Sequence, residues 1–234
     1  MEIPGDNPGL RRVEAARYAL LRRLSLAMRH QMLAHLQPIG MVSEVMQRRL
    51  RAPRPDLAAL GDQMRKVNGF ARSGVGASLD FVSWLAPEPA VEVCLEAAVD
   101  ECVRLLRTHF SFRGFALRHE VVGGAWRVRR QAVRTLLPAV LLALADEAVA
   151  PAGIVVAARA DAGRLVLEAH VRAATGPRGF AAPASYRGLA WSEVEALARS
   201  EGALLQRGRA GASLHWPWAG PDAAGTGGAS PASA

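Results

Sequence analysis

The sequence has few cysteines, few aromatic residues and no long hydrophobic run. Its two cysteines, Cys94 and Cys102, fall eight residues apart in a predicted helix, which is two turns and too far for a disulfide. Arginine interrupts every apolar stretch before it reaches the roughly 18 residues of a membrane span. The first residues show no basic leader followed by an apolar stretch. We therefore expect a cytoplasmic protein without a membrane partner.

Lysine is also scarce, although the chain is basic. Lys66 stands against 28 arginines, and the formal net charge is +8. The densest basic group consists of four arginines and a tryptophan: Arg127, Arg129, Arg130, Arg134 and Trp126. Nucleic-acid-binding proteins cluster basic and aromatic residues on one element. Because the solvated start of a helix also accounts for this group, we expect no nucleic-acid partner.

The first third of the chain carries two long helical patterns. Apolar residues recur at helical spacing from about Leu10 to Arg51, which predicts a helix of about 40 residues and some 60 Å. Two prolines in residues 51–56 end this pattern, and Asp56 is placed to cap a second helix from Leu57 to about Trp84. One hairpin cannot bury both apolar faces alone. The sequence therefore predicts a homodimer that forms a four-helix bundle.

Glycines interrupt the second helical pattern at Gly69, Gly74 and Gly76. A glycine within a helix weakens it but also lets a neighbouring helix come close. We expect these positions to face the first helix or to weaken the second.

Helices and strands mix after a proline-rich break at residues 85–89. The periodicity predicts helices at 93–108, 131–149 and 191–200, and strands at 115–121, 154–158, 165–171 and 212–218. The middle two strands read as a hairpin. The predicted fold class is α+β: a two-helix hairpin in residues 1–88, then an α/β sandwich in 89–219 with helices on one sheet face. Residues 220–234 are rich in Gly, Ala, Ser and Pro and predict a disordered tail.

A stretch of the first helix carries a specific motif. Residues 30–39 read His-Gln-Met-Leu-Ala-His-Leu-Gln-Pro-Ile. They resemble the phosphoacceptor box of histidine kinases, in its variant His-Asp-Phe-Asn-Asn-x-Leu-Gln-Pro-Ile. His30 falls on the phosphoacceptor, and Leu36 to Ile39 match in identity and spacing. Both halves together resemble a histidine kinase without its sensor, with a dimerisation and phosphotransfer hairpin followed by an ATPase-type domain.

The residues around His30 depart from that motif in a chemically important way. A neutral imidazole attacks phosphoryl groups best when an adjacent carboxylate orients it and takes its proton. Gln31 stands at the carboxylate's position, and an amide is no base. We expect direct attack on ATP to be handicapped, while His30 still accepts phosphate from a better donor. The alternative is that His30 is only a surface histidine of the bundle.

A metal site at the histidines is not expected. His35 lies about 140° around the helix from His30, so the two imidazoles point in different directions. The remaining histidines show no spacing that would assemble a zinc site or a catalytic triad.

The second half resembles the kinase ATPase domain but lacks its nucleotide contacts. The resemblance places the magnesium-binding Asn of the family on residues 136–148, at Ala143 or Leu144, and neither side chain binds a hard cation. Asp146 and Glu147 lie nearby and could substitute, although both are typical exposed helix charges. The stretch where the family has its adenine-binding Asp and lid glycines, residues 172–179, has no carboxylate and only two glycines.

The family's later glycine-rich box is reduced to Gly188 and Leu189. Three losses together predict a pseudokinase that does not bind ATP productively. No cofactor is therefore expected. ATP and magnesium would bind only if the chain were an active kinase with a divergent nucleotide site.

The resemblance implies a role in two-component signalling. Phosphoryl groups would pass between His30 and an aspartate of a response-regulator receiver domain, with a cognate kinase as the other expected partner. Gln31 would hydrogen-bond the phosphohistidine or orient a water molecule. Arg22 and Arg23 would seat an acidic partner surface, and Leu33 and Gln37 would line the contact. The alternatives are a catalytically silent adaptor that binds a regulator or kinase, and an active kinase.

Overall fold

The computed structural model describes residues 7–86, 91–122, 126–177, 179–180 and 186–218. By its contacts the chain divides into unit 1, which comprises Met1–Arg23 and Pro89–Ala234, and unit 2, which comprises Leu24–Glu88. The sequence predicts a single boundary at residue 88, whereas the structure groups the first 23 residues with the second half. Residues 87–89 of the expected break and the expected tail at 220–234 lie outside the described residues.

Unit 2 is a helical hairpin. Helix α1 spans Pro8–Leu50, so its first part belongs to unit 1, and α2 spans Leu57–Leu85. Both helices agree with the predicted ones to within two residues. The amino terminus of α2 is capped as expected, because Asp56 Oδ1 accepts a hydrogen bond from the Ala59 backbone N at 3.0 Å.

One glycine of α2 sets a close approach of the two helices. A Cβ on Gly74 would lie 3.2 Å from Leu36 Cδ2, whereas a Cβ on Gly69 or Gly76 would meet nothing within 4 Å. The expected close approach therefore holds at Gly74 alone. The other two glycines occupy open positions.

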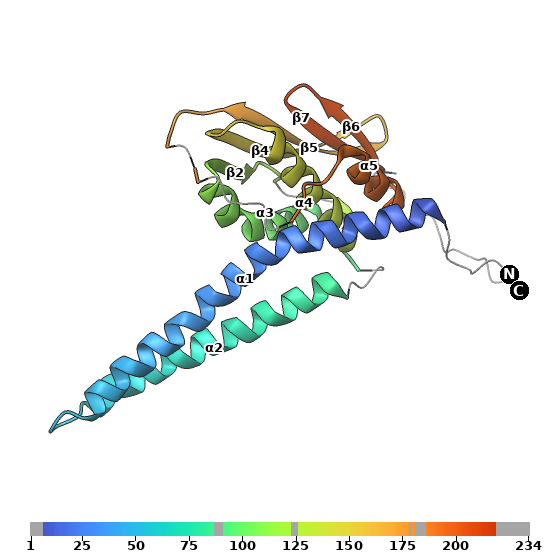
Figure 1. Ribbon diagram of the computed structural model, residues 1–234. Coiled ribbons are helices and arrows are strands. Elements are labelled where there is room, and N and C mark those ends of the chain that lie inside the picture. Colours follow the sequence, from blue (N-terminus) through green and yellow to red (C-terminus); the bar gives the residue numbers. More distant parts are fainter. Residues whose placement is uncertain (1–6, 87–90, 123–125, 178, 181–185, 219–234) are drawn as a thin grey trace, which may run out of the picture. The chain divides into compact units, whose positions relative to one another are not determined.

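Unit 1 contains a five-stranded sheet with the order β2-β4-β5-β7-β6 (Figure 1). Its strands are β2 (Phe115–His119), β4 (Ala152–Asp161), β5 (Arg164–Ala173), β6 (Leu204–Gly208) and β7 (Gly211–Pro217). Strands β2 and β4 are parallel, and the other neighbours are antiparallel. Two short strands, β1 (Glu92–Cys94) and β3 (Arg127–Arg129), pair separately.

Three helices cover one face of this sheet: α3 (Leu95–Phe112), α4 (Arg130–Glu147) and α5 (Trp191–Ser200). The α+β fold class is confirmed, with a helical hairpin followed by a mixed sheet and its helices. Helix α5 has the predicted bounds, and the expected β4–β5 hairpin is present. Strands β1, β3 and β6 were not predicted, and β1 and β3 have only three residues each, which is too few for periodicity to appear.

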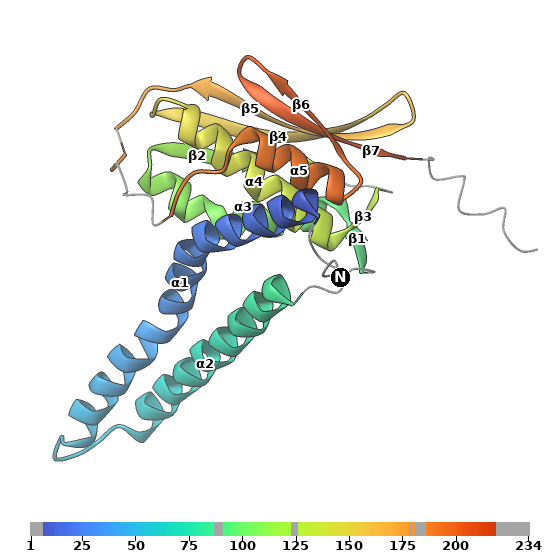
Figure 2. The ribbon, with the colours of Figure 1, turned by 45° about the vertical axis from the view of Figure 1, so that its right-hand side comes forward.

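Helix α4 is the centre of the core. Every residue of α4 from Ala132 to Ala145 is buried, and all of them except Arg134 and Thr135 are apolar. The first part of α1 lies on the side of α3, α4 and α5 that faces away from the sheet (Figures 1 and 2). There Ala16, Ala19 and Leu20 are almost fully buried. Unit 1 is thus three layers deep: the sheet, the three helices and the start of α1.

Candidate functional site

His30 is an exposed residue of α1. Residues three, four, seven and eleven positions further along a helix share a face with it. In α1 these are all exposed and mostly small or apolar: Leu33, Ala34, Gln37 and Met41. The structure therefore brings two of the predicted contact residues, Leu33 and Gln37, onto the face of His30.

Helix α1 offers no carboxylate close to this histidine. Along its full described length its only carboxylates are Glu14 and Glu44, which lie about 24 and 21 Å from His30 along the helix axis. Gln31 is half-buried beside it. The two carboxylates of α1 therefore lie too far along the helix to orient His30.

The two arginines expected to seat a partner have different environments. Arg22 is exposed, and its guanidinium carbon lies 5.6 Å from the centre of the Tyr186 ring. The side chain of Arg23 is only 5% exposed, and it forms an ion pair with Asp146 of α4. Arg23 is therefore not a surface contact. The expected arginine pair reduces to Arg22.

Asp146 is the centre of a charged cluster in unit 1. Arg23 donates two hydrogen bonds to its carboxylate, from Nη1 to Oδ2 at 2.6 Å and from Nη2 to Oδ1 at 2.8 Å. Arg113 Nη2 donates to the same Oδ1 at 3.0 Å and to the Ala145 carbonyl at 2.9 Å. Gly188 adjoins the cluster, since a Cβ there would lie 3.3 Å from Asp146 Oδ2.

Two groups of this cluster have shifted pKa values. Burial alone would raise the pKa of Asp146, but the hydrogen bonds and charges of Arg23 and Arg113 outweigh burial and lower it. The pKa of His109 is lowered by burial first and then by the positive charges of Arg113 and Arg23. At neutral pH the cluster therefore holds an ionised carboxylate between two guanidinium groups.

The resemblance to histidine kinases places the magnesium-binding position at the end of α4, with Ala143, Leu144, Asp146 and Glu147. We call this end of α4 the nucleotide face, and its residues do not fit a magnesium–nucleotide complex. Ala143 and Leu144, at the family's Asn position, are buried apolar side chains. Glu147, the other possible substitute, accepts hydrogen bonds from Trp191 Nε1 at 2.7 Å and from Arg207 Nη2 at 3.0 Å. Both nearby carboxylates are thus bound to arginine, and a hard cation would have to compete with a fixed guanidinium at each.

The expected lid stretch borders a cavity of about 380 Å³. It contributes Thr175, Gly176 and Gly179, opposite residues at the end of α3 and the starts of β2 and β4. Of the lining residues that the structure describes, only Ser111 and Thr175 have polar side chains. The described part of the lining therefore carries no charged side chain that would balance a triphosphate.

Several residues that contact the first part of α1 or its partners could not be identified from the sequence. Arg113, Tyr186 and Glu201 all contact the first part of α1 or its partners, yet they stand in no motif. They are brought together by the fold, since Tyr18 and Tyr186 stand 168 positions apart and Arg17 and Glu201 stand 184 positions apart.

Other kinds of site are absent from the described parts of the chain. Among these residues no three His, Cys, Asp or Glu side chains gather as a metal site would require. No helix within the described ranges is long and apolar enough to cross a membrane.

Comparisons with known proteins give only distant similarity. No protein-family model matches the sequence, and a search of curated proteins found no match. Among solved structures, a histidine kinase from Burkholderia phymatum STM815 shares 16% identity, with 91% of this chain and 98% of that chain covered and a TM-score of 0.44. The Acinetobacter baumannii histidine kinase AdeS shares 12% identity, with 76% of this chain and 96% of that chain covered and a TM-score of 0.43. A bacterial phosphotransferase shares 14% identity, with 84% of this chain and 94% of that chain covered and a TM-score of 0.40. The chain is thus similar to histidine kinases, and its chemistry has to be inferred from its own residues.

Proposed function

We propose that this chain is a histidine phosphotransfer protein of two-component signalling that works without ATP. One observation carries the proposal: His30 is exposed on a small and apolar helix face, while both carboxylates of the nucleotide face are bound to arginine. An exposed imidazole suits exchange of a phosphoryl group with a partner protein. The neutralised carboxylates leave no site for a magnesium–nucleotide complex.

The proposed reaction is a reversible phosphoryl exchange. A ring nitrogen of His30 attacks the phosphorus of an aspartyl phosphate on a receiver domain, so that a P–N bond forms as the P–O bond to the aspartate breaks. The receiver brings the magnesium ion that neutralises the phosphoryl oxygens. Because the aspartyl carboxylate is a good leaving group, this exchange needs less help from a base than attack on ATP.

The neighbours of His30 have assigned roles in this proposal. Gln31 hydrogen-bonds the phosphohistidine or a water molecule. Leu33 and Gln37 form the contact surface on the same helix face, and Arg22 contacts acidic residues of the partner. Substituting Gln31 or Arg22 by alanine would slow the exchange, and unchanged rates for both variants would remove these roles.

The test begins with radiolabelled ATP and magnesium, with nucleotide binding followed by calorimetry on the same sample. We expect neither binding nor label. The protein is then incubated with a phosphorylated receiver domain, and acid-labile label is expected on the wild type and on His35→Gln, but not on His30→Gln. His35 is the matched control, since it lies on α1 in the same hairpin but points about 140° away.

The other outcomes identify the alternatives. Saturable binding of magnesium–ATP, with label that His30→Gln loses, would make the chain an active kinase. A partner complex that forms equally well with wild type and His30→Gln, without label on either, would make it an adaptor. The absence of a carboxylate near His30 on α1 is the observation that favours the adaptor as second candidate.

A further inference from the structure

Residues 8–23 of α1 are attached to the rest of unit 1 along one helix face. Ala16, Ala19 and Leu20 are almost fully buried, and Arg23 continues the same face one turn further on. Small alanine side chains let this segment lie close to the helices beneath it. The burial is as complete as in the core of the unit, so the segment is an integral layer of it.

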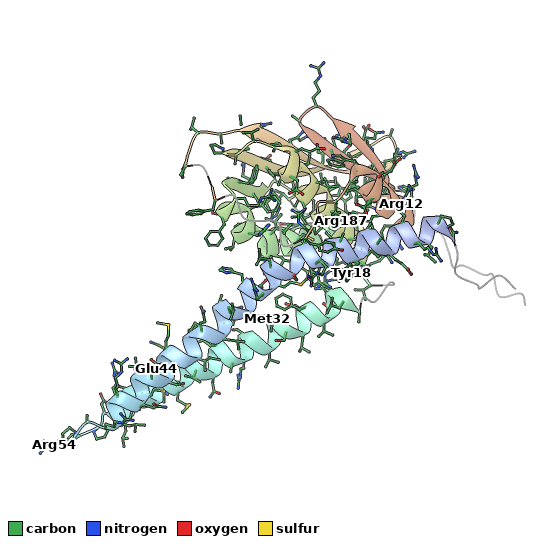
Figure 3. All side chains as sticks on the ribbon, viewed as in Figure 1. Arg12, Tyr18, Met32, Glu44, Arg54 and Arg187 are labelled. Atoms are coloured by element: carbon green, nitrogen blue, oxygen red, sulfur yellow. The ribbon has the colours of Figure 1, made fainter. Side chains whose placement is uncertain are left out.

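Polar and aromatic contacts at Arg17 and Tyr18 reinforce this attachment. Arg17 Nη2 lies 2.8 Å from Glu201 Oε1, in the turn that follows α5. The Tyr18 ring meets the Tyr186 ring edge-on, with centroids 5.8 Å apart. Figure 3 shows Tyr18 on α1 together with Arg187, whose guanidinium lies 6.0 Å from the centre of the same Tyr186 ring.

Arg23 differs from the other contacts because of where its partner stands. Asp146 follows the family's Asn position, Ala143 or Leu144, by only two or three residues on α4. A carboxylate at that place would attract a divalent cation, yet its two oxygens are taken by the forked guanidinium of Arg23. Gly188 leaves the space that this pair needs, because a side chain there would press on Asp146.

We propose that Arg23 is the built-in counter-cation of Asp146, and that this pair latches residues 8–23 of α1 over the nucleotide face and keeps it closed. The inference rests on the proposed ATP-independent function and supplies its structural cause.

Hydrogen exchange of the full chain tests the latch. In Arg23→Ala we expect backbone amides of residues 8–22 to exchange at least about tenfold faster than in the wild type. Arg12→Ala, which removes an exposed arginine from the same segment, serves as the matched control and should leave exchange unchanged. Arg23→Lys should keep more protection than Arg23→Ala, because its ammonium group keeps the positive charge that faces Asp146.

Each result decides the question. Unchanged protection in Arg23→Ala overturns the latch. If Arg23→Ala loses protection throughout the sheet, Arg23→Lys decides, since recovered protection at residues 8–22 supports an ion-pair latch and no recovery overturns it. Magnesium and ATP added to the wild type should leave the exchange of residues 8–22 and of α4 unchanged. Faster exchange at 8–22 or new protection on α4 would overturn the closed face.

The same experiment separates the latch from the proposed function. Phosphotransfer to His30 is measured with a phosphorylated receiver and does not enter the exchange data. Absence of transfer with an intact latch removes only the phosphotransfer role. Unchanged protection in Arg23→Ala with intact transfer removes only the latch.

Discussion

Arginine side chains neutralise partly buried carboxylates of unit 1. Glu101 on α3 is the clearest case, because Arg130 donates to both of its oxygens at 3.1 Å and Arg134 donates a third hydrogen bond. The side chains of Glu101 and Arg134 are only 16% and 3% exposed. Burial alone would raise the pKa of Glu101, but the hydrogen bonds and charges of Arg134 and Arg130 outweigh it and lower the pKa.

Removing the charge of Glu101 should destabilise the fold strongly. In Glu101→Gln the two guanidinium groups lose their counter-charge inside the protein, which costs about 3 kcal/mol of unfolding free energy. Urea unfolding followed by circular dichroism measures the loss. Asp62→Asn is the control, since its partner Arg65 is exposed on α2 and such a pair contributes less than about 1 kcal/mol. Equal losses in both variants would contradict the structural role of Glu101.

The lowered pKa values predict an acid-sensitive fold. Glu101, Asp146 and His109 all have lowered pKa values in the folded protein, so the unfolded chain binds more protons. The contribution of His109 is complete above its ordinary pKa of about 6.5, and those of the carboxylates above about 4. Each contribution to stability is lost as the pH falls through the lowered pKa of that group in the folded protein. Stability should therefore drop between about pH 6.5 and pH 3.

Urea titrations across this pH range check the prediction. The drop should be shallower in Glu101→Gln, because that variant has already lost one of the three groups. A stability that stays constant or rises on acidification would show that these groups are not held in their charged or neutral forms by the fold.

At the scale of elements, the β4–β5 hairpin shows how local sequence fixes a turn. Asp161 pairs with Arg164, so that only Ala162 and Gly163 lie between the strands. Both have positive φ, 46° and 72°, which matches the tight turn that suits the twist of an antiparallel pair. Glycine adopts this conformation without steric cost, and alanine does not.

Gly163→Ala should therefore weaken the hairpin. A second alanine in the left-handed region costs about 1 kcal/mol of unfolding free energy. Chemical denaturation measures this loss. Gly153→Ala in β4 is the matched control, because Gly153 has no positive φ and a Cβ there would lie 4.0 Å from its nearest neighbour. A loss in the control as large as in Gly163→Ala would show that the turn conformation is not the cause.

The elements also show what the sequence could predict. The helices and the long hairpin were predictable because apolar periodicity and the residues around Asp56 and Gly163 act over a few positions. Strands β1 and β3 have three residues each, so periodicity had no length over which to appear. Of the candidate site, the exposure of His30 on its helix follows from local pattern. The Arg23–Asp146 pair joins residues 123 positions apart, and no local pattern encodes it.

At the scale of the whole molecule, α2 carries an apolar stripe that unit 2 does not bury. Its members are exposed large apolar residues: Leu57, Met64, Val75, Leu79 and Val82. Their spacing places them within about 60° of one another around the helix. Together they form a narrow seam about 37 Å long. Such a seam matches the interface of a helical bundle better than a solvated surface.

A second copy of this chain is the occupant that we propose for the seam. Burial of each large apolar side chain contributes about 1.5–3 kcal/mol, so five from each copy suffice for a stable dimer. Leu79→Glu should convert the dimer into a monomer, because a carboxylate would be buried in the seam without a partner. Sedimentation equilibrium or light scattering measures the mass against the 24.9 kDa of one chain.

Val149→Glu provides the control for this last prediction. Val149 is an even more exposed residue of unit 1, outside the hairpin, so its substitution should leave the dimer intact. A monomeric wild type would contradict the four-helix bundle. A dimer lost equally in Val149→Glu would place the interface in unit 1 instead. If the dimer depends on Leu79 but not on Val149, the hairpin that displays His30 is also the element through which two copies assemble.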